Sequence, residues 1–503
     1  MFFFLKVICI LCNYFEHTNN GDFMSIWTLN EKKRKTNILN KDIFVDTLIV
    51  GGGITGMTTA YFLRNNDVCL VDANRIGHGV TMNSTAKINY FQERIYTDIV
   101  SSSNYDNAVK YLHSQKEAIN LIKNIIENEN ILCDFEQVPS YVFANSKEEV
   151  SKLDDEISFL IENGCDVNEK SPPIDCDSYK SYCVNDTYIF NPIKYLNGLY
   201  NLLKDKISIY ENSVIRKIEK VNDNYVCYSK NNKIVCNKVI LACHYPFFLI
   251  PMMMPFRCSL EKSYMIVSKV KKDKKFTCIS SNNPTFSCRY YNDLENIYQI
   301  SLSKSHDLSC SYNDNYYFDR VKEIFKLRDK DIVLKYSNID IMTPDHMPYI
   351  GKLDDNLYIG VGYNTWGMTN GVVAAKIISD LVLGVDNSYV DVFNPKRIGM
   401  QNIIKLPVYM FNNTKSFIGT KINKNRYWYS DKVKFIKKDG VSLGIYTDED
   451  GEHIVYNKCP HLGCSLIFNE VEKTWDCPCH SSRFDLDGHC IKGPSTYDIS
   501  YKK

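Results

Sequence analysis

The apolar pattern near the start of the chain predicts a strand, a helix and a second strand in succession. Val45–Val50 is a short apolar run rich in β-branched side chains, which is typical of a buried parallel strand. Met57–Arg64 is predicted to be helical, and Asp67–Val71 is a second strand-like run that ends at Asp72. Together these elements predict one βαβ unit of an α/β domain.

The middle of the chain alternates between helical and strand-like patterns. Apolar positions recur at helical spacing over Tyr105–Glu129, and a further helix is predicted over Gly371–Leu383. Residues 208–241 predict alternating strands, with Lys238–Ala242 as a buried strand. Residues 256–302 contain runs rich in Tyr, Phe and Ile, which predict a mixed β subdomain for substrate binding.

The pattern changes after about Asp391. Pro395, Gly399 and Pro407 precede a polar stretch rich in Asn and Lys, which predicts a linker over 396–428. Short strands then indicate a small all-β module over 429–503, with strands at Lys432–Ile436, Gly444–Thr447 and His453–Asn457. The main α/β domain is therefore expected over 45–395, after an N-terminal extension over 1–44.

The first residues are apolar but do not form a membrane span. Met1–Phe15 is interrupted by Lys6, is too short to cross a bilayer and lacks the features of a secretory signal. Met24 opens a polar segment and is a possible true start. The alternative is a short membrane-tethering or signal segment. We expect a cytoplasmic protein without stable membrane insertion, and leave membrane association through Met1–Phe15 open.

Charge and cysteine content narrow the function classes. The formal net charge is +1, so nucleic-acid binding gains no support. The 19 cysteines are about 4% of the 503 residues, well below a disulfide scaffold. Most stand singly, which indicates reduced buried thiols, as for Cys69, Cys133, Cys227 and Cys236. The last five crowd into the C-terminal module.

Two short loops in this module carry cysteine and histidine in the same order. Cys459 and His461 are followed by Cys477 and His480, with fifteen residues between His461 and Cys477. Two thiolates and two imidazoles bind either zinc or a Rieske-type [2Fe-2S] cluster. In a Rieske centre one iron takes two Cys and the other two His, so loops that each offer one of each favour the cluster. A structural zinc site is the alternative.

The module resembles Rieske domains of the respiratory type. Cys464 and Cys479 stand where those domains join the two loops by a disulfide, and Gly493-Pro494 matches the proline loop that covers the cluster. Cys490 lies outside the motif and is expected to be a plain buried thiol.

The resemblance is incomplete around the second loop. Ser482 keeps the hydroxyl that can donate to a bridging sulfide, and Ser481 replaces a glycine. Phe484 replaces the tyrosine whose phenol would donate to a cysteine sulfur. With one donor fewer, we expect a reduction potential below the respiratory values.

A glycine fingerprint lies between the first predicted strand and helix. Gly51, Gly53 and Gly56 form Gly-x-Gly-x-x-Gly, and Asp72 follows Gly51 by 21 residues at the end of the second strand. Such glycines let the backbone approach a pyrophosphate at the helix N-terminus, and Asp72 can accept from ribose hydroxyls. A glycine turn in another α/β fold is the alternative.

A distant segment indicates that the nucleotide is FAD. Residues 343–351 and 357–371 resemble the C-terminal flavin loop of the D-amino-acid oxidase and glycine oxidase superfamily. In that loop, backbone N–H groups and a helix N-terminus stabilise negative charge on the reduced flavin. The resemblance implies flavin contacts from Gly362, Trp366, Gly367 and Met368.

Further segments are similar to bacterial FAD-dependent oxidoreductases with a C-terminal Rieske domain, namely 75–81, 84–87, 242–246 and 364–370. The resemblance covers nearly the whole chain. It implies an α/β FAD-binding domain, Rossmann-like and of the glutathione-reductase type, over 45–395 with a mixed β substrate subdomain, and a small all-β Rieske domain. By analogy, Val214 contacts the adenine side of FAD. Relatives that bind flavin covalently carry a cysteine near the position of Asn338, so we expect noncovalent FAD here.

The resemblance also implies a reaction. Enzymes of this superfamily oxidise amines or amino acids by hydride transfer to the flavin, and the cofactor carries that chemistry. A carboxylate-bearing substrate would need an arginine clamp, for which Arg289 is the candidate. Lys304 and His306 are weaker candidates, and His244 is expected to be structural.

The fused cluster predicts where the electrons go. We expect a dehydrogenase that passes electrons from FAD to the cluster and on to an unknown acceptor, rather than an oxidase. A Rieske oxygenase would need a mononuclear iron site, and the ten histidines offer no closely spaced pair outside the cluster motif. The remaining alternative is an electron-transfer or redox-sensing protein without an organic substrate.

Overall fold

The computed structural model describes residues 25–29, 31, 34–245, 257–282, 285–293, 295–308, 313–409, 411 and 429–501. Met1–Phe15 and Met24 lie outside these residues, as do residues 412–428 of the expected linker and the Lys304 side chain. Among the described helices, none has the length and apolar character that a membrane crossing requires.

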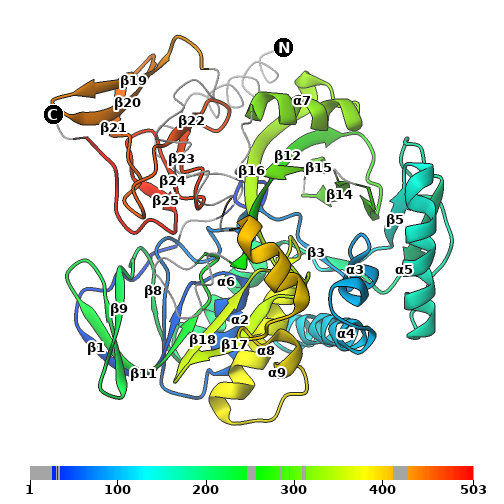
Figure 1. Ribbon diagram of the computed structural model, residues 1–503, viewed down its shortest axis with the longest axis horizontal. Helices are drawn as coiled ribbons and strands as arrows, with labels where there is room; N and C mark the ends of the chain where they lie inside the picture. The colour runs from blue at the N-terminus through cyan, green and yellow to red at the C-terminus, as the bar shows by residue number, and fades with distance from the viewer. Residues whose placement is uncertain are drawn as a thin grey trace.

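The first sheet is built around the predicted βαβ unit (Figure 1). β1 (Ile43–Val50) pairs in parallel with β2 (Val68–Val71) on one side and with β11 (Lys233–Leu241) on the other. α2 (Ile54–Phe62) connects β1 to β2 and begins directly after the glycine turn, earlier than the predicted start at Met57. The sheet continues with β17 (Tyr349–Asp354), β18 (Leu357–Val361) and β8 (Ser208–Tyr210), and with the hairpin β9 (Lys217–Val221) and β10 (Asn224–Tyr228).

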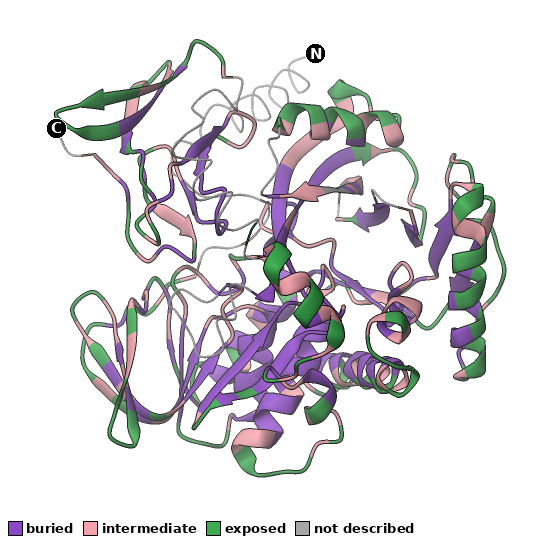
Figure 2. Ribbon diagram, viewed as in Figure 1, coloured by how far each residue is buried: buried purple, intermediate pink, exposed green. Residues whose placement is uncertain are grey.

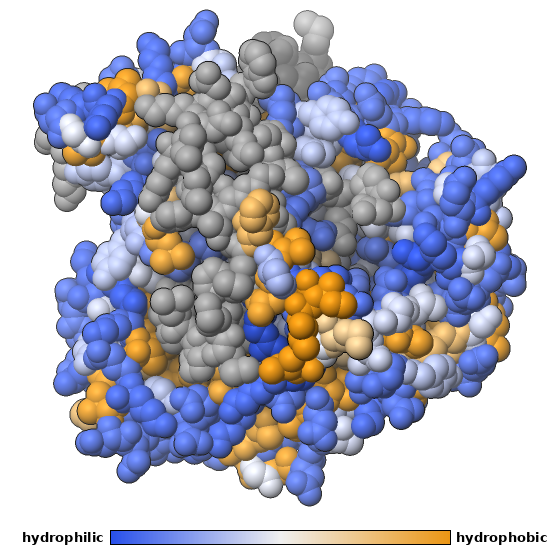
Figure 3. Space-filling view, in the orientation of Figure 1, coloured by the Kyte–Doolittle hydropathy of each residue, from blue (hydrophilic) through white to orange (hydrophobic). Residues whose placement is uncertain are grey.

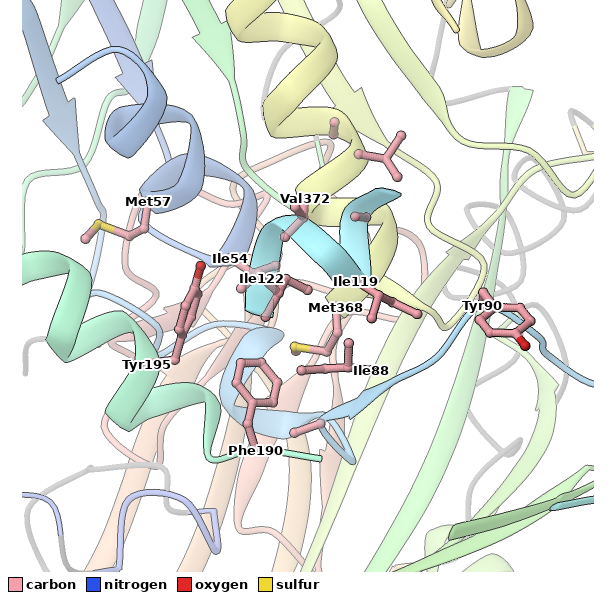
Figure 4. Packing of buried hydrophobic residues seen from close by; sticks show 14 of the residues in the cluster. Ile54, Met57, Ile88, Tyr90, Ile119, Ile122, Phe190, Tyr195, Met368 and Val372 are labelled. Carbon is pink, nitrogen blue, oxygen red and sulfur yellow. The ribbon is translucent and has the colours of Figure 1, made fainter. Parts of the chain in front are cut away.

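Helices cover this sheet and enclose its apolar core. α2 packs against α8 (Gly367–Leu383), and α4 (Tyr105–Asn128) packs against α8 as well. Figure 4 shows Ile54, Met368 and Val372 among the side chains between them. A Cβ at Gly371 would lie 2.7 Å from Ile54 Cγ2, so the helix crossing requires a glycine there. Other helices of this domain are α3 (Ile95–Ser102), α5 (Val150–Glu162), α6 (Pro192–Leu203) and α9 (Val390–Phe393), with 3-10 turns at Thr81–Asn83, Lys147–Glu149 and Asp329–Asp331.

The second sheet forms the mixed β subdomain that the sequence predicts. Its order is β16 (Ile332–Met342), β12 (Ser259–Val270), β15 (Ile297–Asp307), β14 (Phe286–Asn292), β13 (Thr277–Ser280), β5 (Ser140–Ala144) and β6 (Lys180–Val184). Of these strands, the sequence pattern predicts only those between 256 and 302, and not β5, β6 or β16. α7 (Asp314–Ile324) packs on β12. A small sheet of β3 (Lys87–Ile88), β7 (Tyr188–Ile189) and β4 (Glu136–Gln137) lies near the boundary between the two large sheets.

The C-terminal module contains two small antiparallel sheets around their own core. One consists of β19 (Val433–Lys438), β20 (Val441–Asp448) and β21 (Gly451–Tyr456), and the other of β22 (Ile467–Asn469), β23 (Thr474–Asp476), β24 (Arg483–Phe484) and β25 (Cys490–Lys492). Trp475 and Phe484 are fully buried in its centre. Figure 2 shows that β19 and β20 expose their outer residues, whereas β23 and β24 are buried.

The segment predicted to be a linker begins as a helix. Residues 400–409 and 411 are helical. Asn402 on this helix is buried, so it packs against the α/β domain. Gly399 and Pro407 are typical of a chain break, whereas the helical spacing of the apolar residues between them indicates the helix.

Candidate functional site

A cavity of about 460 Å³ runs along the α/β domain and is lined by nearly all of the residues expected to hold FAD. This volume is within the usual range for small-molecule sites. The expected residues that line it are Gly51, Gly53, Asp72, Val214, Gly362, Trp366, Gly367 and Met368. Gly56 does not line it. A Cβ at Gly56 would lie 1.8 Å from the Gly51 carbonyl oxygen, so this glycine allows α2 to pack close to β1.

The glycine turn and Asp72 form one hydrogen-bonded unit. Gly51 has φ of +112°, a conformation that favours glycine. The Gly52 N–H donates to Asp72 Oδ2 at 2.6 Å, and the Asn74 N–H donates to Oδ1 at 2.7 Å. Burial raises the pKa of Asp72 to about 6 against these two donors. Ribose hydroxyls donating to the same carboxylate would further stabilise its charged form.

The expected flavin loop is held by side chains on both sides. A Cβ at Gly362 would lie 2.5 Å from Thr343 Cγ2, and the Thr343 N–H donates to Asn364 Oδ1 at 2.8 Å. α8 begins at Gly367, directly after Trp366, so its N-terminus points its partial positive charge at the cavity wall. The loop geometry therefore suits the electron-rich edge of a flavin.

A buried ion pair supports this loop. Its arginine, Arg397, lies in the segment that the sequence predicts to be a linker. Arg397 donates from Nε and Nη2 to the two carboxylate oxygens of Asp345, both at 2.8 Å. Burial alone would raise the pKa of Asp345, but the charge of Arg397 and the hydrogen bonds to the carboxylate together outweigh it, so the pKa is lowered. The pairing joins residues 52 positions apart, and no local pattern signals it.

Lys87 is a cationic group at the β-subdomain end of the cavity. The sequence alone predicts no role for it. Its Nζ donates to Ser287 Oγ at 2.9 Å and to the Cys278 carbonyl oxygen at 3.3 Å. It also lies 5.9 Å from the centroid of the Trp366 ring. Burial lowers the pKa of Lys87 to about 8. The available signal was a lysine within the apolar run that becomes β3.

The structure does not place Arg289 as a substrate clamp. Its side chain is 1% exposed and does not line the cavity. Nη1 donates to the carbonyl oxygens of Thr85, Ala86 and Phe190 at 2.8, 2.7 and 3.2 Å. Arg289 therefore braces the segment before β3 against β14, and the clamp hypothesis is withdrawn.

The two histidines that the sequence singles out beside Arg289 have different surroundings. His306 is hydrogen-bonded to the Tyr264 hydroxyl at 3.1 Å and does not line the cavity. His244 does line it, and its buried Nε2 has no hydrogen-bond partner among the described residues. Burial lowers the pKa of His244 to about 3, so its imidazole is neutral.

The expected cluster ligands come together at the junction of the C-terminal sheets. The rings of His461 and His480 lie 5.0 Å apart, centroid to centroid. Both Nδ1 atoms are buried and, within the described chain, neither has a hydrogen-bond partner. Burial lowers the pKa of His461 to about 4 and that of His480 to about 3, so both are neutral imidazoles, the form that binds metal.

The two cysteine ligands complete the set. The Cys477 thiol, within hydrogen-bonding reach, lowers the pKa of Cys459 to about 7, which favours the thiolate that a metal requires. Cys464 and Cys479 are joined in a disulfide. Cys477 Sγ lies within 4.8 Å of both disulfide sulfurs, but a disulfide offers no thiolate to a metal. Two buried imidazole nitrogens without a partner among the described residues and two adjacent thiols, supplied by the same two loops, make up the donor set of a [2Fe-2S] cluster.

The C-terminal module closes one wall of the same cavity. Lys492, Pro494 and Ser495 line it together with the glycine fingerprint. Cys490 also lines it and is only partly buried, so it is not the enclosed thiol that was expected. β25 is the strand of the module that faces the first sheet (Figure 1), and the Asn74 side chain donates to the Ile491 carbonyl oxygen at 3.0 Å.

A buried network of charges fixes the module against the β subdomain. Arg483 donates to Glu472 Oε1 at 2.8 Å, to Asp476 Oδ2 at 2.9 Å and to Ser337 Oγ at 2.9 Å. Lys262, which is fully buried, lies 2.8 Å from Asp314 and 3.7 Å from Asp476. Two domains linked by several buried charges keep one relative position.

The family model for FAD dependent oxidoreductases, named DAO, matches residues 46–381. The chain belongs to the DAO family. A second model, the Rieske [2Fe-2S] domain, matches residues 421–501 of this DAO-family protein. The expected cofactors, FAD and a [2Fe-2S] cluster, are thus confirmed, and so is the predicted fold class.

Two relatives of this DAO-family protein match it over different shares of its length. The Rieske 2Fe-2S iron-sulfur protein YhfW of Bacillus subtilis (strain 168) is 29% identical over 478 residues, covering 91% of this chain and 93% of YhfW. Gamma-glutamylputrescine oxidoreductase of Escherichia coli (strain K12) is 23% identical over 380 residues, covering 69% of this chain and 85% of that protein.

Two solved structures resemble this chain in fold over part of its length. Glycine oxidase from Geobacillus kaustophilus superposes with a TM-score of 0.58 and 15% identity over 71% of this chain and 99% of its own. L-proline dehydrogenase from P. horikoshii gives a TM-score of 0.56 and 16% identity over 71% of this chain and 98% of its own. At these identities the likeness shows the fold.

Proposed function

We propose that this protein oxidises an amine or an amino acid with FAD and delivers the electrons through the Rieske cluster to an acceptor. One observation carries the proposal: a single cavity is lined by Gly51 and Trp366 of the FAD domain and by Lys492 and Pro494 of the Rieske domain. When bound, FAD takes two electrons from an organic substrate, and the cluster carries electrons one at a time. The shared wall supports direct transfer between the two groups.

The substrate class is supported by relatives and by the polar groups at the β-subdomain end of the cavity. Gamma-glutamylputrescine oxidoreductase, glycine oxidase and L-proline dehydrogenase are named for an amine or an amino acid. In this chain, Lys87 can pair with a substrate carboxylate, and Ser287 beside it can donate a hydrogen bond. Met265 and Leu302 line the same end and supply an apolar wall for the substrate side chain.

The two histidine ligands support a route inward and a route outward. His480 is 6% exposed, and its ring centroid lies 5.7 Å from that of Tyr245, which lines the cavity. His461 is only partly buried and precedes Leu462, which is 44% exposed. Electrons can reach the cluster on the side of His480 and leave it on the side of His461, to an acceptor that binds over the exposed Leu462. This arrangement favours a dehydrogenase over an oxidase.

Anaerobic titration with a panel of amines and amino acids tests the proposal. The flavin absorbance and the cluster absorbance are followed separately in the holoenzyme. We expect at least one compound to bleach the flavin, and the cluster to become reduced in the same sample. A matched His461→Ala variant, which lacks a cluster ligand, should lose the second signal and keep the first.

The alternative function, electron transfer or redox sensing without an organic substrate, predicts a different result. No compound of the panel would bleach the flavin, although dithionite would reduce both centres. A flavin that is bleached by substrate while an intact cluster stays oxidised would contradict the proposed route.

A further inference from the structure

The helix over 400–411 presents an apolar face to solvent. Six large apolar side chains on and just before it are between 53% and 74% exposed: Ile398, Met400, Ile403, Ile404, Val408 and Phe411. From Met400 onward their spacing is helical, so they form one stripe. Figure 3 shows hydrophobic side chains gathered at the centre of the face where this helix lies in Figure 1. A contiguous patch of this kind marks an interaction surface, unlike single exposed residues.

The polar residues of the same helix point the opposite way, into the protein. Asn402 donates to Asp345 Oδ2 at 3.3 Å and accepts from the Tyr349 hydroxyl. Lys405 Nζ donates to the Pro344 carbonyl oxygen at 2.9 Å. Arg397, just before the helix, is bound to Asp345. These bonds fix the rotation of the helix, so the outward direction of the apolar stripe is built into the fold.

The sequence around the helix is basic and contains no acidic residue. Residues 392–430 include seven Lys and Arg and no Asp or Glu, although the whole chain has a formal net charge of only +1. Of these seven, Arg397 is paired with Asp345, and Lys396 is exposed. Four belong to the sequence 412–428, outside the described residues. The apolar stripe thus belongs to a segment of strongly positive charge.

From these observations we propose that the helix over 400–411, with Ile398, docks on an anionic lipid surface and lies in the plane of the interface. An apolar helix face within a basic stretch of sequence is the pattern of interfacial helices, whose binding combines apolar burial with attraction to anionic headgroups. A second copy of the chain is a poorer occupant, because its facing segment carries the same positive charge. Docking of this kind requires no membrane crossing.

Flotation with vesicles tests the docking. The holoenzyme is mixed with vesicles of phosphatidylcholine alone or of phosphatidylcholine and phosphatidylglycerol in equal parts. We expect binding to the anionic vesicles, weakening as salt is raised. The double variant Ile403→Ser/Ile404→Ser should bind at least about tenfold more weakly, because apolar burial drives insertion. Its FAD and cluster absorbance should match the wild type, since both side chains are exposed.

Two matched controls make the result decisive. Phe44→Ser removes an apolar side chain that is 76% exposed on β1, and should leave vesicle binding unchanged. A chain that starts at Met24 removes the apolar Met1–Phe15 and should still bind. The proposal is overturned if the wild type does not bind anionic vesicles, if the double variant binds as well as wild type, or if the chain from Met24 loses binding. It is also overturned if the double variant instead dissociates a dimer of the wild type in solution.

Discussion

The rings of Tyr245 and His480 lie 5.7 Å apart across the contact between the FAD domain and the Rieske domain. Tyr245 follows β11 and lines the cavity proposed to hold FAD, whereas His480 is one of the four proposed cluster ligands. One aromatic side chain therefore spans the space between the cavity and the cluster. Both residues are buried, at 6% exposure each, so water is excluded from the contact.

Replacement of Tyr245 should slow electron transfer between the two centres. In Tyr245→Leu, the aromatic ring that fills the contact is lost, and the remaining gap weakens the packing against His480. Stopped-flow mixing should show an unchanged rate of flavin reduction and a slower reduction of the cluster. Tyr245→Phe keeps the ring and should behave as wild type. Equal cluster reduction rates in all three proteins would show that the ring has no part in the route.

Loss of Arg483 should separate the Rieske domain from the β subdomain. Arg483→Met removes the guanidinium from two buried carboxylates and leaves Asp476 with only the more distant Lys262 as a cation, which should lower the free energy of unfolding by about 3 kcal/mol. Thermal unfolding followed by cluster absorbance measures this. As a control, Lys180→Met removes a cation from an ion pair with Glu169, whose side chain is 62% exposed, and should change stability by less than about 1 kcal/mol. If the two variants melt alike, the buried network does not hold the domains together.

Lys87 should raise the reduction potential of the flavin, because its positive charge near Trp366 favours the anionic reduced form. Lys87→Met should lower that potential by about 30 mV, equivalent to about 1.4 kcal/mol for two electrons. Lys87→Arg should retain most of the effect. Spectroelectrochemical titration of the holoenzyme supplies the measurement.

The same variant predicts a pH dependence. Since burial lowers the pKa of Lys87 to about 8, the side chain is charged below that pH and neutral above it. The difference in potential between wild type and Lys87→Met should be full at pH 7 and should shrink as the pH rises through 8. A difference that is constant with pH would mean that Lys87 does not act through its charge.

Phe484→Tyr should raise the reduction potential of the cluster. Phe484 is fully buried in the Rieske core, beside the second ligand loop. A phenol at this position could donate to a cysteine sulfur and stabilise the reduced cluster. Phe484→Leu lacks both ring and donor and serves as the control for packing changes. A potential that stays at the wild-type value in Phe484→Tyr would refute the account of this residue.

Local motifs made the two cofactors predictable from sequence. The fingerprint glycines and Asp72 belong to one βαβ unit, and the four proposed cluster ligands lie within two short loops, so the spacing of these residues indicates the cofactors. The strands of the FAD domain were equally visible, because a buried parallel strand such as β1 is a continuous apolar run.

Contacts between distant residues were beyond such reasoning. Arg289 has the residue type of a clamp, but only the fold shows that its guanidinium is bound by backbone carbonyls of the segment before β3 and of Phe190. The pairing of Arg397 with Asp345 and the network around Arg483 join segments that have no sequence relationship. The helix at 400–409 is hard to predict for another reason. Gly399 and Pro407 are typical of a chain break, and they conflict with the helical spacing of the apolar residues between them.

The most direct test of the central claim is rapid anaerobic mixing of the holoenzyme with a reducing amine or amino acid, with freeze-quench detection of the reduced cluster by electron paramagnetic resonance. The account predicts that the cluster signal grows as the flavin is reduced, within a single turnover and without an added mediator. A fully reduced flavin beside a cluster that remains oxidised throughout the turnover would contradict it.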